Sequence, residues 1–156
     1  MSPISDVAIR PAGPDDARVL GALTLRWDLS QPHAVQRDDF VGEYAAAWLA
    51  AGSNRPAWLA EQPDGNPVGY VMGALVTRLP SLRPRTRGWL HLSAVYVDPA
   101  WRRQGIGERM LREVAAWAAE QDLDRIQLNA ADEARSLYRR VGFGAAQDTL
   151  MQLTID

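Results

Sequence analysis

The sequence DPAWRRQGIGERML, from Asp98 to Leu111, places paired arginines and spaced glycines directly before a stretch with helical periodicity. The arginines are Arg102 and Arg103, and the glycines are Gly105 and Gly107. The first turn of a helix has N–H groups without backbone partners, and the helix dipole adds positive potential there. Glycines let a bulky anion approach these groups, and arginines add charge and bidentate donors. The stretch predicts a diphosphate-binding loop; the alternative is a tight turn with solvated arginines.

Two common phosphate-binding motifs do not fit this stretch. A Walker A loop needs lysine and then serine or threonine after its last glycine, but Gly107 is followed by Glu108 and Arg109, and the chain contains no lysine. A dinucleotide-binding fingerprint needs a third small residue for close packing of helix on strand, where this chain has Met110. The predicted anion therefore belongs to another class of ligand.

Outside this stretch, the chain alternates between strand and helix periodicities. A first helix is predicted within residues 13–27, with Asp15 or Asp16 near its N-cap, and further helices at residues 37–51, 105–121 and 132–141. Strands are predicted at residues 7–11, 56–62, 67–79, 88–97, 124–130, 142–147 and 149–155. This order predicts a mostly antiparallel sheet with helices on its faces and one strand–loop–helix crossover in the middle.

The strand at residues 88–97 leads directly into the glycine-containing loop. Regular alternation of side chains along a strand assigns them to two faces. One face is predicted to carry Leu90, Leu92 and Ala94, and the other Trp89, His91, Ser93 and Val95.

Composition limits the remaining possibilities. The 156 residues suffice for a single domain, residues 1–156, and the net charge of −2 argues against a nucleic-acid partner. The chain has no cysteine, which excludes disulfides, a thiol nucleophile and a thiolate metal site; no metal is predicted. The N-terminus lacks the pattern of a signal peptide, and no apolar run approaches the ~20 residues of a membrane span. We therefore expect a cytoplasmic protein without a membrane partner.

The pattern Arg102-x-x-Gly105-x-Gly107, after AVYVDP and before an amphipathic helix, resembles the acyl-CoA motif of the GCN5-related N-acetyltransferases (GNAT). LYRRVGF, at residues 137–143, resembles the second hallmark of that family, and the order of elements matches as well. The resemblance implies an α/β (α+β) GNAT fold, with a mixed, mostly antiparallel sheet of roughly six to seven strands flanked by about four helices. It also implies transfer of an acetyl group from acetyl-CoA to a primary amine, by direct attack in a ternary complex.

The same resemblance implies how acetyl-CoA would bind. The cofactor diphosphate sits on loop amides, the preceding strand carries a bulge and splays from the next strand, and the pantetheine arm pairs with the backbone exposed there. The implied cofactor-binding residues are Val95, Tyr96, Val97, Arg102, Arg103, Gln104, Gly105, Ile106, Gly107, Glu108 and Asn129. One position departs from the family: Ala131 stands where many members have asparagine, and Asn129 is the nearest substitute.

The chemistry requires an acid and a base, because the leaving thiolate needs a proton and an ammonium group must lose one. Tyr138 matches the family's tyrosine near the sulfur, so its hydroxyl is the candidate acid; simple packing is the alternative. His91 lies eleven residues before Arg102, where histone-modifying members carry a glutamate base, and an imidazole pKa near 6.5 suits that role. A water chain is the alternative base.

Candidates for contact with the acceptor amine are Trp27, Asp28 and Ser93, since the family's first helices wall that site. Trp48 is expected in the core, and His33 in a connecting loop, with contact to the substrate as the alternative. The arginines of the loop at residues 78–87 are expected in solvent, with binding of the acceptor or of the cofactor's 3′-phosphate as the alternative. The acceptor is a small-molecule or peptide amine. A non-catalytic acyl-CoA sensor or interaction module of the same fold is the alternative function. Dimers are common in the family, so a homodimer is included among the expectations, without an indicated interface.

Overall fold

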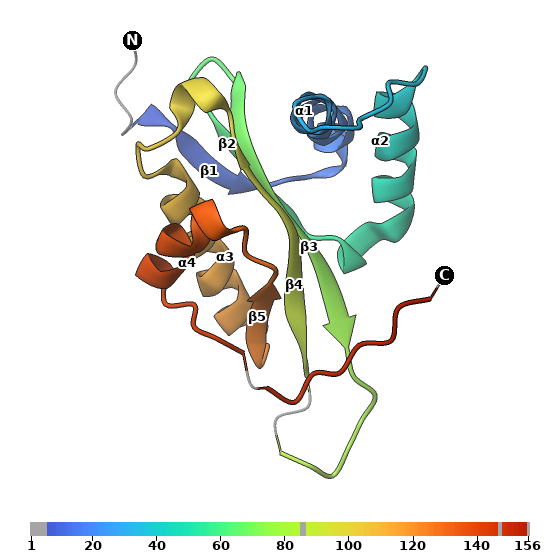
Figure 1. Ribbon diagram of the computed structural model, residues 1–156, viewed down its shortest axis with the longest axis vertical. Coiled ribbons are helices and arrows are strands. Elements are labelled where there is room, and N and C mark those ends of the chain that lie inside the picture. The colour runs from blue at the N-terminus through green and yellow to red at the C-terminus, as the bar shows by residue number, and fades with distance from the viewer. Residues whose placement is uncertain (1–5, 85–86, 147, 156) are drawn as a thin grey trace.

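A five-stranded sheet in the order β1-β2-β3-β4-β5 forms the centre of the computed structural model, which describes residues 6–84, 87–146 and 148–155 (Figure 1). Neighbouring strands are antiparallel except β4 and β5, which are parallel. The strands are β1 (Ala8–Pro11), β2 (Ala57–Glu61), β3 (Pro67–Thr77), β4 (Gly88–Val97) and β5 (Arg125–Leu128). The helices are α1 (Ala17–Leu29), α2 (Phe40–Ala51), α3 (Ile106–Glu120) and α4 (Arg135–Val141). The mixed, mostly antiparallel α/β architecture predicted from the sequence is confirmed.

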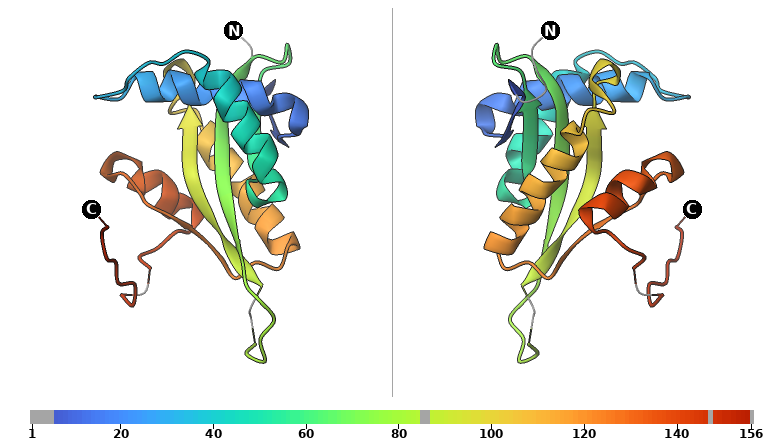
Figure 2. Two further views of the ribbon diagram at one scale, coloured as in Figure 1. Left: turned by 90° about the vertical axis from the view of Figure 1, so that its right-hand side faces the viewer. Right: turned by 90° about the vertical axis from the view of Figure 1, so that its left-hand side faces the viewer.

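Two layers of helices cover the sheet, α1 and α2 on one face and α3 and α4 on the other (Figures 1 and 2). The face toward α3 holds the larger core cluster, in which Leu90 of β4 packs with Met110 and Val114 of α3. The face toward α1 holds the second cluster, in which Leu20 and Leu23 of α1 pack with buried side chains of β2 and β3. Full burial of each such aliphatic side chain contributes about 1.5–3 kcal/mol, so the two clusters fix β3 and β4 between the helix layers.

Helix α3 follows the predicted apolar stripe closely. Its buried residues are Ile106, Gly107, Met110, Leu111, Val114 and Ala118, and Trp117 packs edge-on against Trp58 of β2. The helix begins immediately after the loop at residues 102–105. Burial of this stripe therefore anchors the first turn of α3 against the sheet, which fixes where the loop ends.

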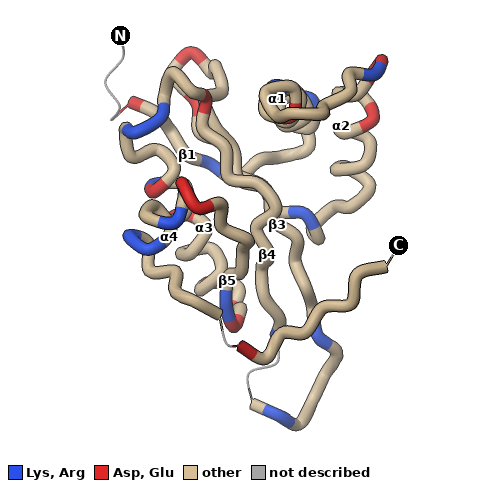
Figure 3. The backbone as a smooth tube through the Cα atoms, in the orientation of Figure 1, with Lys and Arg blue, Asp and Glu red and all other residues tan. Residues whose placement is uncertain are grey.

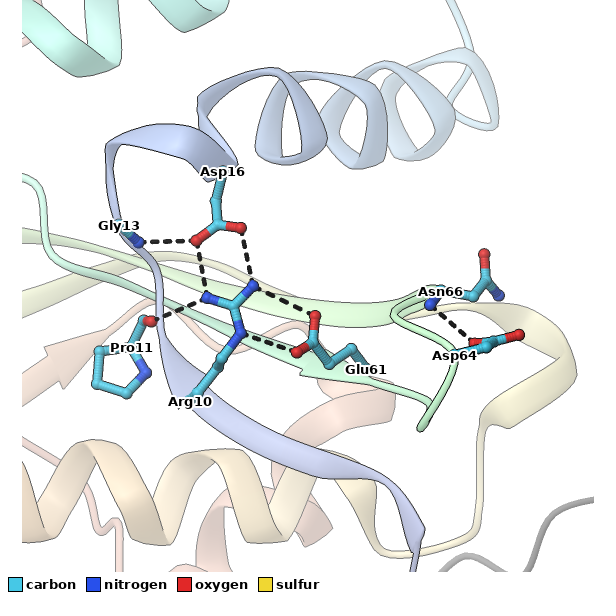
Figure 4. A network of polar contacts seen from close by, with 7 residues as sticks. All are labelled: Arg10, Pro11, Gly13, Asp16, Glu61, Asp64 and Asn66. Atoms are coloured by element: carbon cyan, nitrogen blue, oxygen red, sulfur yellow. Dashed lines mark hydrogen bonds and ion pairs between the residues drawn. The ribbon is translucent and has the colours of Figure 1, made fainter.

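A network of charged side chains lies at the start of α1. Pro14–Asp16 form a 3-10 turn, and α1 begins at residue 17 with Asp16 at the N-cap position, which confirms the N-cap predicted near Asp15 or Asp16. The guanidinium of Arg10 contacts Asp16 and Glu61, each at 2.8 Å (Figure 4). Its hydrogen bonds hold the pKa of the Asp16 carboxyl below its ordinary value. This network joins β1, β2 and the turn before α1.

A β-bulge interrupts β4 and reverses its side chains. Met72 pairs with Ala94 and the next residue, Gly73, pairs with Leu92, so Ser93 is an extra residue on β4. The prediction of one alternation through residues 88–97 was therefore wrong beyond Leu92. Ala94 packs on the α1 side, not with Leu90 and Leu92, and Val95 joins their cluster instead. A single inserted residue shifts the period-two pattern by one position. The alternation of residues along β4 alone cannot predict such an insertion.

The sheet ends at β5, two strands short of the prediction. Residues 142–146 and 148–155 form no strand, and Gln147 lies outside the described residues. Gly142 adopts the left-handed conformation that ends α4, with φ of 118°, and Phe143 donates its N–H to the Tyr138 carbonyl. Alternating apolar residues predict a strand, but a strand also needs a partner edge, and here the segment stays apart from the sheet.

The described helices include none that is both long enough and apolar enough to cross a membrane. Acidic and basic positions occur on both sides of the sheet (Figure 3). Arg85 of the predicted polar loop lies outside the described residues.

Candidate active site

The loop before α3 presents a row of backbone donors. Among the described residues, the N–H groups of residues 103–108 donate no hydrogen bond, and the first bond of the helix start runs from the Arg109 N–H to the Gly105 carbonyl at 3.0 Å. Arg103 and Gly105 both have positive φ, 60° and 82°. A non-glycine residue in this region costs about 1–2 kcal/mol, so the backbone is held in a shape that local preference opposes. Free N–H groups at a helix start form an anion site.

The two glycines of the motif meet different requirements. Gly105 has open space around its α-carbon, so its positive φ is what favours glycine there. A Cβ at Gly107 would approach Leu137 Cδ2 to 3.3 Å and Val97 Cγ2 to 3.8 Å. Gly107 therefore permits close contact of α3 with α4 and with the end of β4, at the point where the free amides lie.

Arg102 is tied to the strand that precedes the loop. Its Nε donates to the Val97 carbonyl at 2.9 Å, and its guanidinium lies 6.0 Å from the centre of the Tyr96 ring. The side chain remains exposed, and no described residue accepts a hydrogen bond from its Nη groups. Arg103 is also exposed. Arg102 thus links the end of β4 to the loop while its outer donors remain open to an anion.

β4 and β5 separate directly after the bulge. Their parallel pairing ends at Leu92 and Leu128, so residues 93–97 have no partner on the β5 side. The Asp98 N–H donates to Val68 of β3 at 2.8 Å, and alternation therefore turns the backbone groups of Val95 and Val97 away from β3, into the gap. The bulge and the splay implied by the family resemblance are both present.

This gap fits an extended polar chain that pairs with an exposed strand edge. The Val95 N–H and carbonyl and the Val97 N–H face it, whereas the Val97 carbonyl is occupied by Arg102. The backbone of Tyr96 faces β3 instead, so its predicted role in binding through the backbone lacks this geometric support. Asn129 is exposed and follows Leu128, at the point where the strands part.

Tyr138 contributes a hydroxyl without a protein partner. It is half-buried on α4 beside the α3 core cluster, and its ring packs edge-on against Phe143 with 5.7 Å between centroids. Burial raises the pKa of the phenol above its ordinary value. No described residue hydrogen-bonds to the hydroxyl. A protonated phenol with an unused donor is suited to giving a proton to a bound group.

His91 lies on the paired side of the bulge, opposite Ala74 of β3 and Gln127 of β5. It is half-buried and points to the face opposite Leu90 and Leu92, toward the α1 and α2 layer. Its ring has no hydrogen-bond partner among the described residues. Its role as a base stays a prediction.

Ser93, the extra residue of the bulge, is held by a residue that the sequence did not single out. Its Oγ donates to the Met72 carbonyl at 3.3 Å and accepts from Arg55 Nη2 at 3.1 Å. The Arg55 carbonyl in turn accepts from the Trp48 indole at 2.8 Å. Arg55 lies between α2 and β2 with no motif around it, so only the fold brings its charge to the bulge.

The end of α1 is fixed over the end of β4. Trp27 stacks on Tyr96 with 5.5 Å between rings, and Arg26 and the Tyr96 hydroxyl both contact Asp98, at 2.6 and 2.8 Å. Burial and the Asp98 carboxylate raise the pKa of Tyr96 to about 12. Trp27 therefore supports the strand beside the loop, in addition to any contact with an acceptor.

A cavity of about 350 Å³ lies between the end of α1 and the connector to α2. Its lining includes Asp28, the predicted acceptor contact, together with His33, Arg37 and Phe40. His33 lies in the connecting loop as predicted; it is exposed, with φ of 69°, and contributes to this wall. Within the described part of the chain, His, Asp and Glu side chains form no group of three able to hold a metal.

Comparisons with known proteins agree with this geometry. The model of the acetyltransferase (GNAT) family matches residues 22–143. The N-alpha-acetyltransferase RimI of Mycobacterium tuberculosis is 30% identical over 130 residues, which cover 80% of this chain and 77% of the relative.

Solved structures with the same fold include a predicted acetyltransferase from Clostridium acetobutylicum with acetyl-CoA, at a TM-score of 0.75 and 20% identity over 95% of this chain and 96% of the other. An aminoglycoside acetyltransferase from an uncultured soil metagenomic sample, in complex with trehalose, has a TM-score of 0.77 and 17% identity over 98% and 99%.

Proposed function

The chain belongs to the GNAT acetyltransferase family and moves an acyl group from acetyl-CoA to an amine; we propose that the acceptor is a primary amine of a small molecule or a peptide. The observation that carries the proposal is the row of unpaired amides at residues 103–108, adjacent to the gap between β4 and β5. The proposal assigns residues 1–156 to a single acetyltransferase domain.

The residues present fit coenzyme A. The amides of residues 103–108 and the side chains of Arg102 and Arg103 would hold its diphosphate, and the backbone of Val95 and Val97 would pair with its pantetheine arm. Asn129, at the parting of the strands, would contact the same arm. Bound acetyl-CoA supplies the activated thioester.

The chain's own side chains would manage the protons. The reaction forms a C–N bond, breaks the C–S bond and leaves a thiolate. The Tyr138 hydroxyl would donate its proton to that sulfur, and its raised pKa keeps it protonated at neutral pH. The amine must arrive uncharged, and His91, on the acceptor side of the sheet, would accept the proton of the ammonium form.

The acceptor site would be formed by the α1 and α2 layer, with Asp28 near the cavity and Trp27 and Ser93 near the gap. A carboxylate in this wall suits a cationic amine. The relative acts on N-terminal amines by its name, and one structural neighbour is an aminoglycoside acetyltransferase by its title. Peptide N-termini and amino sugars are therefore the first acceptors to test.

Release of free thiol from acetyl-CoA, measured with a panel of such amines, tests the proposal. We expect amine-dependent release, and Tyr138→Phe should lower kcat about a hundredfold, the range for loss of a general acid. Tyr44→Phe, which removes the same atom from a residue to which no role is assigned, is the matched control. An unchanged rate for Tyr138→Phe across pH would remove the acid role. Binding of acetyl-CoA without thiol release for any amine would favour a sensor instead.

A cytoplasmic location and a homodimer belong to the same proposal. The cysteine-free chain suits a reducing compartment. The dimer is supported by the exposed apolar side chains of Leu150, Met151, Leu153 and Ile155, which a second copy would cover.

A further inference from the structure

Three arginines around β4 lack a carboxylate partner. They are Arg55, before β2, Arg78, after β3, and Arg125, at the start of β5. No Asp or Glu carboxylate of the described residues lies within ion-pair distance of their guanidinium groups, although other arginines of the chain do form such pairs. Cations that gather without counter-charges create a local positive potential, which attracts an anion.

Arg78 and Arg125 approach the same aromatic ring. Trp89 of β4 pairs with Arg125 on β5, and with Val76 on β3, two residues before Arg78. The guanidinium carbon of Arg125 lies 4.3 Å from the centre of the Trp89 ring, and that of Arg78 lies 5.2 Å from it. Each cation is attracted to the ring, but the two cations repel each other. Both arginines are exposed, so an anion from solvent can contact both and relieve that repulsion.

Arg55 places a third cation beside the β-bulge. Its Nη2 donates to Ser93 Oγ at 3.1 Å, and the Trp48 indole donates to its carbonyl at 2.8 Å, so both ends of the residue are held. Arg55 is half-buried, and its other guanidinium N–H groups donate no hydrogen bond to a described residue. A held guanidinium with open donors suits a carboxylate, which can accept two parallel hydrogen bonds. This site adjoins the gap proposed for the pantetheine arm.

The two cationic sites lie along one face of the sheet. Trp89 faces the α1 and α2 layer, because the next residue, Leu90, packs in the α3 core cluster. Arg125 faces the same layer, because Ile126 packs in that cluster. From Trp89 to the bulge at Ser93 the strand advances about 13 Å, at about 3.3 Å per residue. β3 and β4 extend past the end of α2 toward the loop that joins them, so the helix layer leaves this end of the face open (Figures 1 and 2).

We propose that the acceptor is an acidic peptide that lies along this face, with its amine at the gap. A first carboxylate, on the residue that carries the amine or the next one, contacts Arg55. A second, about four residues later, contacts Arg78 and Arg125. The inference rests on the proposed acyl transfer and names the acceptor within it. A nucleic acid strand carries a charge at every nucleotide, about 3.4 Å apart, which matches two separated cationic sites less well.

Thiol release with three hexapeptide amides tests the preference. In an alanine background, the second and sixth positions carry glutamate, glutamine or arginine. We expect kcat/KM for the glutamate peptide to exceed that for the glutamine peptide about tenfold or more, and the arginine peptide to be the poorest acceptor. Equal values for the three peptides, or a preference for arginine, would overturn the inference while leaving acyl transfer to amines intact.

Calorimetry with the same peptides separates this inference from the proposed function. Tighter binding of the glutamate peptide than of the glutamine peptide, without thiol release, would support the acidic-peptide site and contradict the proposed function alone. Failure of the glutamate peptide to bind, while amino sugars are acetylated, would overturn the inference alone. Tighter binding of a single-stranded RNA oligomer than of the glutamate peptide would also overturn it.

Substitutions identify the residues that read the charge. Arg55→Gln should raise KM for the glutamate peptide about tenfold more than KM for the glutamine peptide. Arg78→Gln combined with Arg125→Gln should give about a two- to fivefold difference, because both arginines are exposed. Arg18→Gln is the matched control, since Arg18 is exposed and has no ion pair among the described residues, but lies at the start of α1, at the other end of that helix from Trp27. An equal effect of Arg18→Gln would overturn the assignment.

Reversal of the charge distinguishes recognition from support of the bulge. Arg55→Glu should make the arginine peptide a better acceptor than the glutamate peptide, because the sign of the contact is reversed. A residue that only holds the bulge would lower kcat/KM for all three peptides alike, and that result would overturn the proposal. Circular dichroism of each variant checks that it is folded.

Discussion

The two halves of β4 differ in what lies beside them. From Trp89 to Leu92 the strand pairs with β3 on one side and β5 on the other, and from Ala94 to Val97 it pairs with β3 alone. The first half is held by pairing with both neighbouring strands and by core packing, with Leu90 fully buried. The second half keeps its packing but leaves backbone groups unpaired. The proposed ligand contacts are thus separated from the half of the strand that pairs on both sides, and substitutions in each half should affect different properties.

The largest effect on stability is expected from Leu90→Ala in the paired half. Leu90 is 0% exposed and lies in the α3 core cluster. Its truncation should lower the free energy of unfolding by about 2–5 kcal/mol, measured by denaturant titration. Affinity for coenzyme A, measured by calorimetry on the folded protein, should change little. A loss of affinity as large as the loss of stability would contradict the separation.

Val95→Pro, in the splayed half, should lower the affinity for coenzyme A while changing stability little. The Val95 N–H faces the gap, so proline removes a donor for the ligand without removing a bond to β3. The dissociation constant for coenzyme A should rise about tenfold or more. Val95→Ala keeps the N–H and serves as the control for lost side-chain packing. Equal affinities of the two variants would show that the gap-facing amide does not bind the ligand.

The phenol of Tyr138 gives a smaller, pH-dependent effect. Burial raises its pKa in the folded state, so above the ordinary value of 10.0 the unfolded chain binds fewer protons than the folded one. Stability therefore falls as pH rises through that range. Tyr138→Phe should make the fall between about pH 9 and 11 less steep, by thermal unfolding, while Tyr44→Phe is measured for comparison. The same slope in wild type and Tyr138→Phe would contradict a buried phenol.

The smallest effect is expected at the boundary between the halves. Ser93→Ala removes the contacts with Arg55 and the Met72 carbonyl, but Ser93 is exposed. The free energy of unfolding should change by no more than about 0.5 kcal/mol. A change in KM for the amine without a change in KM for acetyl-CoA would assign Ser93 to the acceptor side. An equal change in both KM values would indicate that Ser93 acts by maintaining the bulge.

The parts of the site that the sequence could predict are those coded by neighbouring residues. The amphipathic pattern from Ile106 to Ala118 fixed α3, and Gly105 and Gly107 marked the loop before it. The bulge at Ser93 was expected only through the family resemblance, because one extra residue in β4 depends on the register against β3. Arg55 was missed, because its contact with Ser93 spans 38 positions and no local pattern marks it.

By itself, the sequence determined the helix stripes, the alternation of β4 as far as Leu92, the absence of thiol chemistry and the loop whose amides lack partners. These are short-range properties, since a helix turn or a glycine's φ depends on a few adjacent residues. Only the tertiary structure decided where β4 parts from β5, which backbone groups face the gap and where the last apolar segment lies. Those outcomes depend on pairing between distant strands, and the same alternating segment is a strand only where an edge receives it.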